Sequence, residues 1–183
     1  MTTYRDTDGQ GGIAVREKVG GERLEGFFRD ILTHHPADSI VFVCIGTDRS
    51  TGDALGPLTG SRLREYGISS VIGTLPEPCD ADNLKQKLLS VPEDKTVIAI
   101  DACLGSEHSV GSYLISSSPL LPAESVGGKL PAVGDYSIAA VVNRNGPRPY
   151  QALQVTSLYR VMKMADEIAA AAAAAFKRIR DIT

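Results

Sequence analysis

The chain has 183 residues, of which 43% are hydrophobic, and a net charge of −3 from 19 basic and 22 acidic side chains. This length suits one domain, and the lack of a Lys/Arg block argues against a nucleic-acid partner. No run approaches the ~20 apolar residues of a membrane span, and an odd number of cysteines argues against a disulfide framework. We therefore expect a soluble protein of the reducing cytoplasm.

Residues 1–19 are polar and rich in glycine, so they carry too little apolar surface to offset the cost of ordering. We expect them to form a loose N-terminal tail, with a single domain over residues 20–183. That domain is predicted to begin with an amphipathic helix over 22–35, which Pro36 ends. Its apolar stripe consists of Leu24, Phe27, Phe28, Ile31 and Leu32.

A buried parallel strand is predicted over 39–45, because its apolar residues do not alternate with polar ones. Gly46 allows a sharp turn into a polar loop over 46–52, and a helix follows from Asp53 to Glu65. Because ligands bind at the carboxyl ends of strands in open α/β sheets, this loop is the first candidate for a site.

The next β-α-β segment has the same form. A short strand is expected at 69–74, a helix at 80–89 capped by Asp80 or Asp82, and a buried strand at 96–100 that ends in Asp101. If the two buried strands are neighbours in a parallel sheet, Asp53 and Asp101 face one crevice, although 48 residues separate them in the chain.

The last third of the chain gives weaker patterns. A strand is expected at 111–116 and a long functional loop at 117–134. A hairpin around Asn145-Gly146 would join strands at 136–142 and 150–155, although a helix at 136–142 stays open. A helix over 157–180 closes the chain, and its run of seven alanines suits close packing. These elements predict a three-layer α/β/α fold with a mostly parallel central sheet.

The loop at 46–52 does not match a nucleotide site. It lacks the Gly-Lys-Ser/Thr ending of a P-loop and the GxGxxG spacing, and Asp53 would occupy the helix terminus that attracts a phosphate. Two carboxylates in one site could instead act as base and acid, because they cannot both ionise cheaply. The plainer alternatives are that Asp53 or Thr51 caps its helix and that Asp101 accepts backbone hydrogen bonds.

No cofactor is required by this pair, and no dedicated metal ligands are predicted. A divalent metal stays an alternative if His108 joins Asp53 and Asp101, whereas His34 and His35 suit a helix end. A cysteine nucleophile lacks a base near Cys79 or Cys103, and no G-x-S-x-G elbow is present. We expect the substrate to contact eight residues beside the pair: Gly46, Thr47, Asp48, Arg49, Ser50, Thr51, Gly52 and Cys103.

The run from Val43 to Pro57, Val-Cys-Ile-Gly-Thr-Asp-Arg-Ser-Thr-Gly-Asp-Ala-Leu-Gly-Pro, resembles the YyaC family of sporulation proteins. That family is related to the germination protease of spore-forming bacteria and shares the fold of hydrogenase maturation proteases. The resemblance spans about residues 22–180, and three further segments support it: Ile98-Ala-Ile-Asp-Ala-Cys-Leu-Gly105, Gly134-Asp-Tyr-Ser-Ile138 and Val161-Met-Lys-Met-Ala165.

The resemblance implies a hydrogenase-maturation-protease-like, phosphorylase/hydrolase-like fold for the peptidase-like domain. In the germination protease, which cleaves small acid-soluble spore proteins, the acids of the matching segments are the proposed catalytic pair, and here these are Asp53 and Asp101. In the hydrogenase proteases the corresponding acids bind nickel together with a later histidine, whereas this chain has no histidine after His108.

Two hypotheses follow from the resemblance. The first is a cytoplasmic endopeptidase of a sporulating cell or spore, which acts on a protein or peptide substrate such as small acid-soluble spore proteins. The second is a non-catalytic sporulation or germination factor that binds a protein or peptide in the same crevice. Neither hypothesis involves nucleic acid or a membrane, and neither fixes the oligomeric state.

Overall fold

The structure is a computed structural model that describes residues 2–7, 13–122 and 130–180. Strands are β1 (Thr2–Thr7), β2 (Ile13–Val19), β3 (Ile40–Cys44), β4 (Val71–Ile72), β5 (Thr96–Gly105), β6 (Tyr113–Ser116) and β7 (Tyr136–Arg144). Helices are α1 (Leu24–His34), α2 (Leu55–Glu65), α3 (Leu84–Leu88), α4 (Pro149–Gln154) and α5 (Leu158–Arg180), and short 3-10 turns are η1 (Gly21–Arg23), η2 (Ala37–Ser39) and η3 (Glu107–Ser109).

The described strands form one mixed sheet in the order β1-β2-β6-β7-β5-β3-β4. β7, β5, β3 and β4 are parallel, which confirms the α/β class. β1, β2 and β6 add antiparallel pairs on the other side of β7, so the sheet is parallel only in the half that carries the two predicted buried strands. The site lies in this parallel half.

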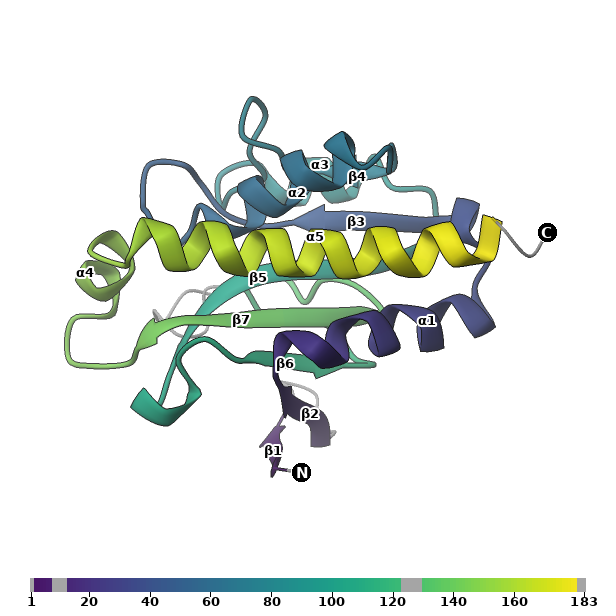
Figure 1. The fold of residues 1–183 in the computed structure, drawn as a ribbon. Coiled ribbons are helices and arrows are strands. Elements are labelled where there is room, and N and C mark those ends of the chain that lie inside the picture. The colour runs from purple at the N-terminus through teal and green to yellow at the C-terminus, as the bar shows by residue number, and fades with distance from the viewer. Residues whose placement is uncertain (1, 8–12, 123–129, 181–183) are drawn as a thin grey trace.

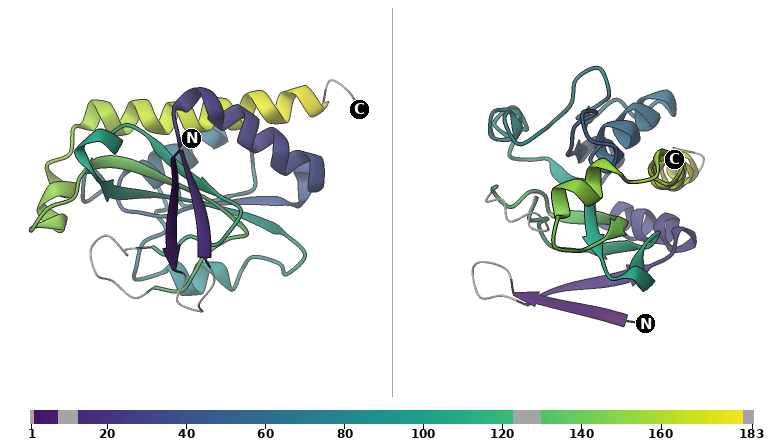
Figure 2. Two further views of the ribbon diagram at one scale, coloured as in Figure 1. Left: turned by 90° about the horizontal axis from the view of Figure 1, so that it is seen from below. Right: turned by 90° about the vertical axis from the view of Figure 1, so that its left-hand side faces the viewer.

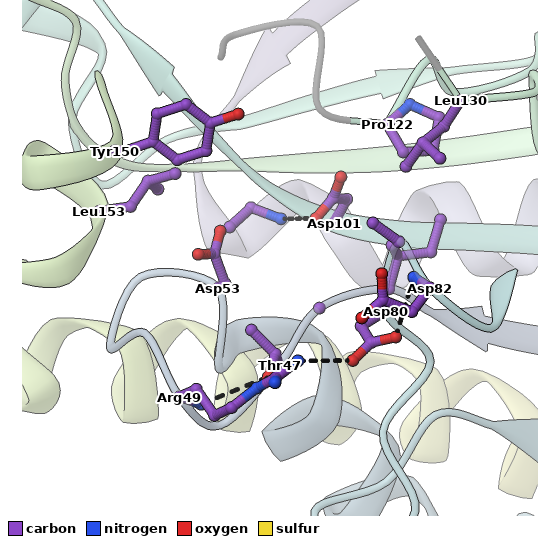
Figure 3. Close-up of a pocket in the computed structure, with 14 residues that line it drawn as sticks. Thr47, Arg49, Asp53, Asp80, Asp82, Asp101, Pro122, Leu130, Tyr150 and Leu153 are labelled. Atoms are coloured by element: carbon purple, nitrogen blue, oxygen red, sulfur yellow. Dashed lines mark hydrogen bonds and ion pairs between the residues drawn. The ribbon is translucent and has the colours of Figure 1, made fainter. Parts of the chain in front are cut away.

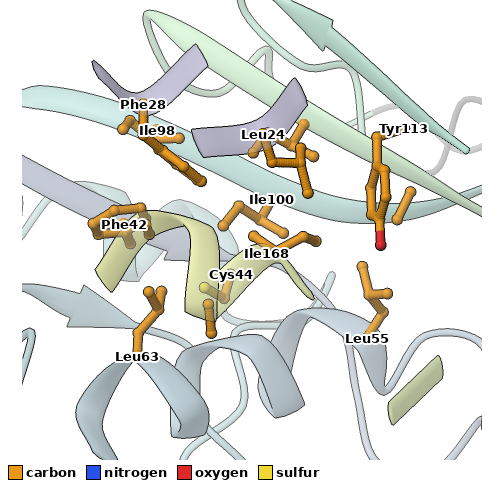
Figure 4. Close-up of a cluster of buried hydrophobic side chains, with 14 of the residues drawn as sticks. Leu24, Phe28, Phe42, Cys44, Leu55, Leu63, Ile98, Ile100, Tyr113 and Ile168 are labelled. Carbon is orange, nitrogen blue, oxygen red and sulfur yellow. The ribbon is translucent and has the colours of Figure 1, made fainter. Parts of the chain in front are cut away.

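Helices α1, α2 and α5 cover one face of the sheet, and the short α3 lies on the other (Figure 1 and Figure 2). On the first face, Phe28 and Ile168 pack with inward side chains of β3 and β5 such as Phe42 and Ile100 (Figure 4). On the second face, Leu84 of α3 packs with smaller side chains from the same strands. The helical layer on the second face is therefore incomplete, which leaves room there for a pocket.

The alanine run of α5 lies against the rest of the core. Ala169, Ala172 and Ala175 are fully buried, and they recur at the spacing of one helical face. Small side chains let α5 approach α1 and α2 closely, and both helices contact it along its length. The prediction that this run is a packing feature is confirmed.

The N-terminal segment differs from the loose tail predicted for residues 1–19. β1 and β2 form an antiparallel hairpin, and β2 pairs with β6 through Glu17, Lys18 and Val19. Backbone hydrogen bonds to an existing sheet edge stabilise this polar segment, and such pairing needs no apolar content.

The predicted hairpin around Asn145-Gly146 is wrong. β7 runs parallel to β5 over Tyr136–Arg144, and residues 149–154 form helix α4 rather than a strand. Pro149 is the first helical residue, where proline needs no N–H partner and its fixed φ suits the helix. The predicted long loop at 117–134 has an isolated bridge between Leu120 and Val133, and its residues 123–129 lie outside the described part of the chain.

Candidate active site

A pocket of about 230 Å3 lies beyond the end of β3, where β5 continues past its neighbour (Figure 3). It contains four aspartates and one arginine among largely apolar neighbours. Its lining residues are Ile45, Gly46, Thr47, Arg49, Asp53, Asp80, Ala81, Asp82, Asp101, Ala102, Pro122, Leu130, Tyr150 and Leu153. The two aspartates predicted as a pair therefore face one pocket.

The turn at Gly46 directs the chain from β3 into the pocket wall. Gly46 has φ +143°, and a Cβ there would lie 2.0 Å from the carbonyl oxygen of Asp53. Its N–H donates to the carbonyl of Cys79 at 2.8 Å, while Ile45 N donates to Ile100 O at 2.7 Å. Only glycine fits this position, because its backbone conformation and the close Asp53 carbonyl both exclude a side chain.

Asp53 lies in the turn that precedes α2. Thr47 N donates to the Asp53 carbonyl at 3.2 Å, and Gly52 N donates to the Leu153 carbonyl at 2.9 Å, so the loop is fixed at both ends. The N-cap of α2 is Ala54, which means that neither Asp53 nor Thr51 occupies the cap position. The Asp53 carboxyl is thus directed to the pocket instead of serving as a helix cap.

Asp101 lies inside β5 rather than at its end, because pairing with β7 extends the strand to Gly105. The last residue of β3, Cys44, pairs with Ile100, so Asp101 is the first residue of β5 beyond that neighbour. Its neighbours in sequence, Ile100 and Ala102, belong to the core under α1, α2 and α5, which directs Asp101 to the opposite face. Asp101 Oδ1 accepts a hydrogen bond from Ala102 N at 2.7 Å.

Burial raises the pKa of both carboxyl groups. Desolvation is the largest cause at Asp101, whose pKa is well above its usual range, and the nearby charge of Asp53 raises it further. The Ala102 N–H partly opposes this shift. The pKa of Asp53 is raised by burial and lowered in part by the Ser50 hydroxyl. Two neighbouring carboxyl groups with raised pKa values favour a state in which the pair shares one proton.

The polar side chains around Asp53 and Asp101 form few hydrogen bonds and ion pairs. Ser50 Oγ is buried beside the Asp53 carboxyl without a hydrogen bond of ordinary geometry. Arg49 contacts Asp80 at 3.1 Å and donates from Nε to Thr47 Oγ1 at 3.2 Å. The Arg49 side chain is 72% exposed, so this ion pair shapes the pocket mouth more than it stabilises the fold.

The predicted residues separate into two groups. Gly46, Thr47 and Arg49 line the pocket with the two aspartates. The rest of the predicted substrate contacts are absent from its lining: Asp48, Ser50, Thr51, Gly52 and Cys103. Of these, Gly52 supports the wall through Leu153, and Asp48 is exposed to solvent.

A metal-binding set does not form around the pair. His108 is an exposed residue of the turn η3 and is not part of the pocket lining. Across residues 2–7, 13–122 and 130–180, no three His, Cys, Asp or Glu side chains gather closely enough to hold a metal ion. Asp53 and Asp101 supply two carboxylate ligands, fewer than the three protein ligands of a catalytic zinc site.

Other lining residues were not predicted as part of the site. Asp80 and Asp82 were assigned to a helix cap, but α3 begins at Leu84 with Asn83 as its N-cap. The bridge between Cys79 and Ile45 brings Asp80 to the same sheet edge as the other acids, and the sequence alone does not show this pairing. Tyr150 and Leu153 belong to α4, which was predicted as a strand.

The described helices include none with the length and apolar content of a membrane span. A solved structure of the [NiFe] hydrogenase maturation protease HycI from Thermococcus kodakarensis KOD1 has a TM-score of 0.57 and 19% identity, and it covers 82% of this chain and 99% of that one. This likeness shows the fold, as predicted.

The sequence comparisons show the family. The uncharacterized protein YyaC of Bacillus subtilis (strain 168) is 47% identical over 162 residues, which cover 86% of this chain and 79% of that protein. A model of the family described as protein of unknown function (DUF1256) matches residues 13–171. The predicted YyaC resemblance is therefore confirmed, and the chain belongs to the DUF1256 family.

Proposed function

We propose that this protein is an endopeptidase in which Asp53 and Asp101 carry out the hydrolysis. The observation that carries the proposal is that two carboxyl groups with raised pKa values face one pocket. Perturbed carboxyl pairs of this kind are typical of hydrolytic sites that activate water. The hydrogenase-maturation-protease-like fold supports the same class of reaction.

The different surroundings of the two groups assign their roles. Asp53, whose pKa rise the Ser50 hydroxyl moderates, is the carboxylate that accepts a proton from water as its oxygen attacks the peptide carbonyl. Asp101, the more deeply buried group, holds the proton that passes to the leaving amine nitrogen when the C–N bond breaks. The proton on Asp53 then returns to Asp101, and the pair regains its starting state.

The substrate in this proposal is a protein, and small acid-soluble spore proteins are the first candidates because of the resemblance to the germination protease. The chain would then act in the cytoplasm of a sporulating cell or spore. Pro122, Leu130 and Leu153 give the pocket an apolar wall that suits a peptide side chain, and Arg49 lies where it could pair with a substrate carboxylate.

The test incubates purified native protein with small acid-soluble spore proteins, with and without a chelator, and identifies fragments by mass spectrometry. Asp53→Asn and Asp101→Asn are the test variants, and Asp48→Asn is the matched control because it lies on the same loop but outside the pocket. We expect discrete fragments from native protein and Asp48→Asn only, with no effect of the chelator. Equal cleavage by Asp53→Asn would contradict the aspartate mechanism.

A second candidate function is a sporulation or germination factor that binds a peptide without cleaving it. The mostly apolar lining of the pocket favours this candidate, because binding needs no reactive carboxyl group. Here native protein and Asp53→Asn would bind the spore proteins equally in a calorimetric titration, and native protein would yield no fragments. Retained binding by Asp53→Asn together with loss of the cleavage seen in native protein would argue for the peptidase.

A further inference from the structure

A second surface feature lies next to the pocket, at the junction of α4 and α5. Among the described residues, eight large apolar side chains are exposed, and five of them fall within residues 150–162. We call these five the α4–α5 patch: Tyr150, Val155, Leu158, Tyr159 and Met162. Tyr159 is 78% exposed and Val155 is 70% exposed, so the patch is unusually apolar for a surface.

The α4–α5 patch is continuous with the pocket. Tyr150 belongs to both, and in Figure 3 its ring lies on the same side as Leu153, above Asp53. On its other sides, Val155 lines a hollow of about 460 Å3 and Tyr159 lines one of about 410 Å3. Figure 1 shows α4 beyond the start of α5, at one end of the sheet. A chain that occupies the pocket can therefore continue onto the patch.

Away from the aspartates of the pocket, the charged residues around the patch are mostly cations. Between residues 136 and 165 the sequence has no Asp or Glu and four cations: Arg144, Arg148, Arg160 and Lys163. The two hollows contain these cations, and Glu167 is the one carboxylate that lines either of them. Glu167 lies 3.7 Å from Lys163, whereas in the described part of the chain neither Arg144 nor Arg148 forms an ion pair with a carboxylate.

This distribution of charge selects the occupant. A second copy that docked through the same patch in a twofold arrangement would place these cations against one another, which disfavours a homodimer. An amphipathic segment with acidic flanks would cover the aromatic and aliphatic side chains and pair with the cations. Tyrosine and methionine are also enriched at the centres of protein interfaces.

We propose that the α4–α5 patch is a docking site for an acidic amphipathic segment of a protein partner. The inference rests on the proposed function, because the partner is the protein whose peptide enters the aspartate pocket. Docking outside the pocket would hold the substrate near Asp53 and Asp101 and would select among proteins with similar cleavage sequences.

The test measures binding by fluorescence anisotropy, with labelled helical peptides as probes. One peptide has Leu on one face and Glu on the other, and its twin has Lys in place of each Glu. Asp53→Asn protein prevents cleavage during the measurement. The patch variant combines Leu158→Ser with Tyr159→Ser, and Leu89→Ser is the matched control because Leu89 is 87% exposed but lies outside the patch.

We expect the Glu peptide to bind about tenfold more tightly than its Lys twin, a difference of ~1.4 kcal/mol. The patch variant should lose about tenfold in affinity, whereas Leu89→Ser should bind as before. Combined Arg148→Glu and Lys163→Glu substitutions should remove the preference for the Glu peptide. Thermal unfolding at an unchanged midpoint shows that these surface variants remain folded.

Several results would overturn the proposal. One is equal affinity for the two peptides, and another is an equal loss of affinity for the Glu peptide in Leu89→Ser and the patch variant. The proposal also fails if the patch binds anionic vesicles instead of peptide, or if it forms a concentration-dependent dimer that the patch variant abolishes. If native protein cleaves spore proteins and the patch variant cleaves them with the same KM, the docking site fails while the peptidase stands. If charge-selective binding persists and no protein is cleaved, the peptidase fails while the docking site stands.

Discussion

The carbonyl oxygen of Asp53 lies only 2.0 Å from the position that a Cβ on Gly46 would take. We therefore predict that Gly46→Ala lowers the free energy of unfolding by about 2 to 4 kcal/mol, because the new side chain meets backbone and Gly46 has φ +143°. Gly26→Ala is the control: it lies in α1 with no neighbour near its Cβ and should stabilise by about 0.5 kcal/mol. Equal midpoints of both variants in denaturant would contradict this.

Asp101→Asn should make the protein more stable at neutral pH. Folding raises the Asp101 pKa, so the folded chain retains a proton that the unfolded chain releases, and stability falls as pH rises from the ordinary value of 3.8 to the folded pKa. The asparagine removes this cost, about 1.4 kcal/mol for each pKa unit of the rise, and can still accept the Ala102 N–H bond. Denaturant titrations should show the gain at pH 7 and none well below pH 3.8. A pH-independent difference would count against this assignment.

The proposed roles predict a bell-shaped pH dependence of cleavage. Activity should rise as Asp53 ionises and fall as Asp101 loses its proton, and burial moves both limbs above the ordinary carboxyl range. The measurement is kcat/KM for one defined cleavage across pH. A single rising limb centred on the ordinary carboxyl pKa would contradict the paired assignment.

Much of the site could be predicted because short, continuous stretches of sequence determine the strands and the turn that form it. The unbroken apolar runs at 39–45 and 96–100 indicated two buried strands, and Gly46 marked the turn between strand and loop. The positions of Asp53 and Asp101 followed from the rule that parallel strands end at one sheet edge. That rule placed them in one pocket without any knowledge of the packing.

The rest depended on pairing between distant segments. β5 continues beyond Asp101 because Ala102 and Cys103 pair with β7, and the sequence of residues 101–105 alone does not show that partner. The strand prediction for 150–155 followed apolar residues and gave too little weight to Pro149 at the first helical position. Tyr150, and with it the connection between the pocket and the α4–α5 patch, was therefore missed.

Tyr113→Phe should destabilise the protein by about 1 to 2 kcal/mol. The buried Tyr113 hydroxyl donates to Glu167 Oε2 at 2.5 Å. Burial is the largest cause of the raised tyrosine pKa, and the Glu167 carboxylate raises it further. The phenylalanine removes the donor but keeps the ring, so the loss measures the hydrogen bond. Tyr66→Phe is the matched control, since Tyr66 is 54% exposed. Both variants are compared by their denaturant midpoints, and an equal change in both would contradict a specific role for the Glu167 bond.

Ser50→Ala should raise the pKa of Asp53 further, because the hydroxyl is the group that moderates the effect of burial there. The measurement is an NMR titration of the Asp53 side-chain carboxyl carbon in native and variant protein. This experiment needs no substrate. If the chain cleaves proteins as proposed, the rising limb of its pH profile should move upward by the same amount, because that limb reports the ionisation of Asp53. If the Asp53 pKa rises but the activity profile does not move, another group is the base. If the Asp53 pKa is unchanged, Ser50 does not act on this carboxyl.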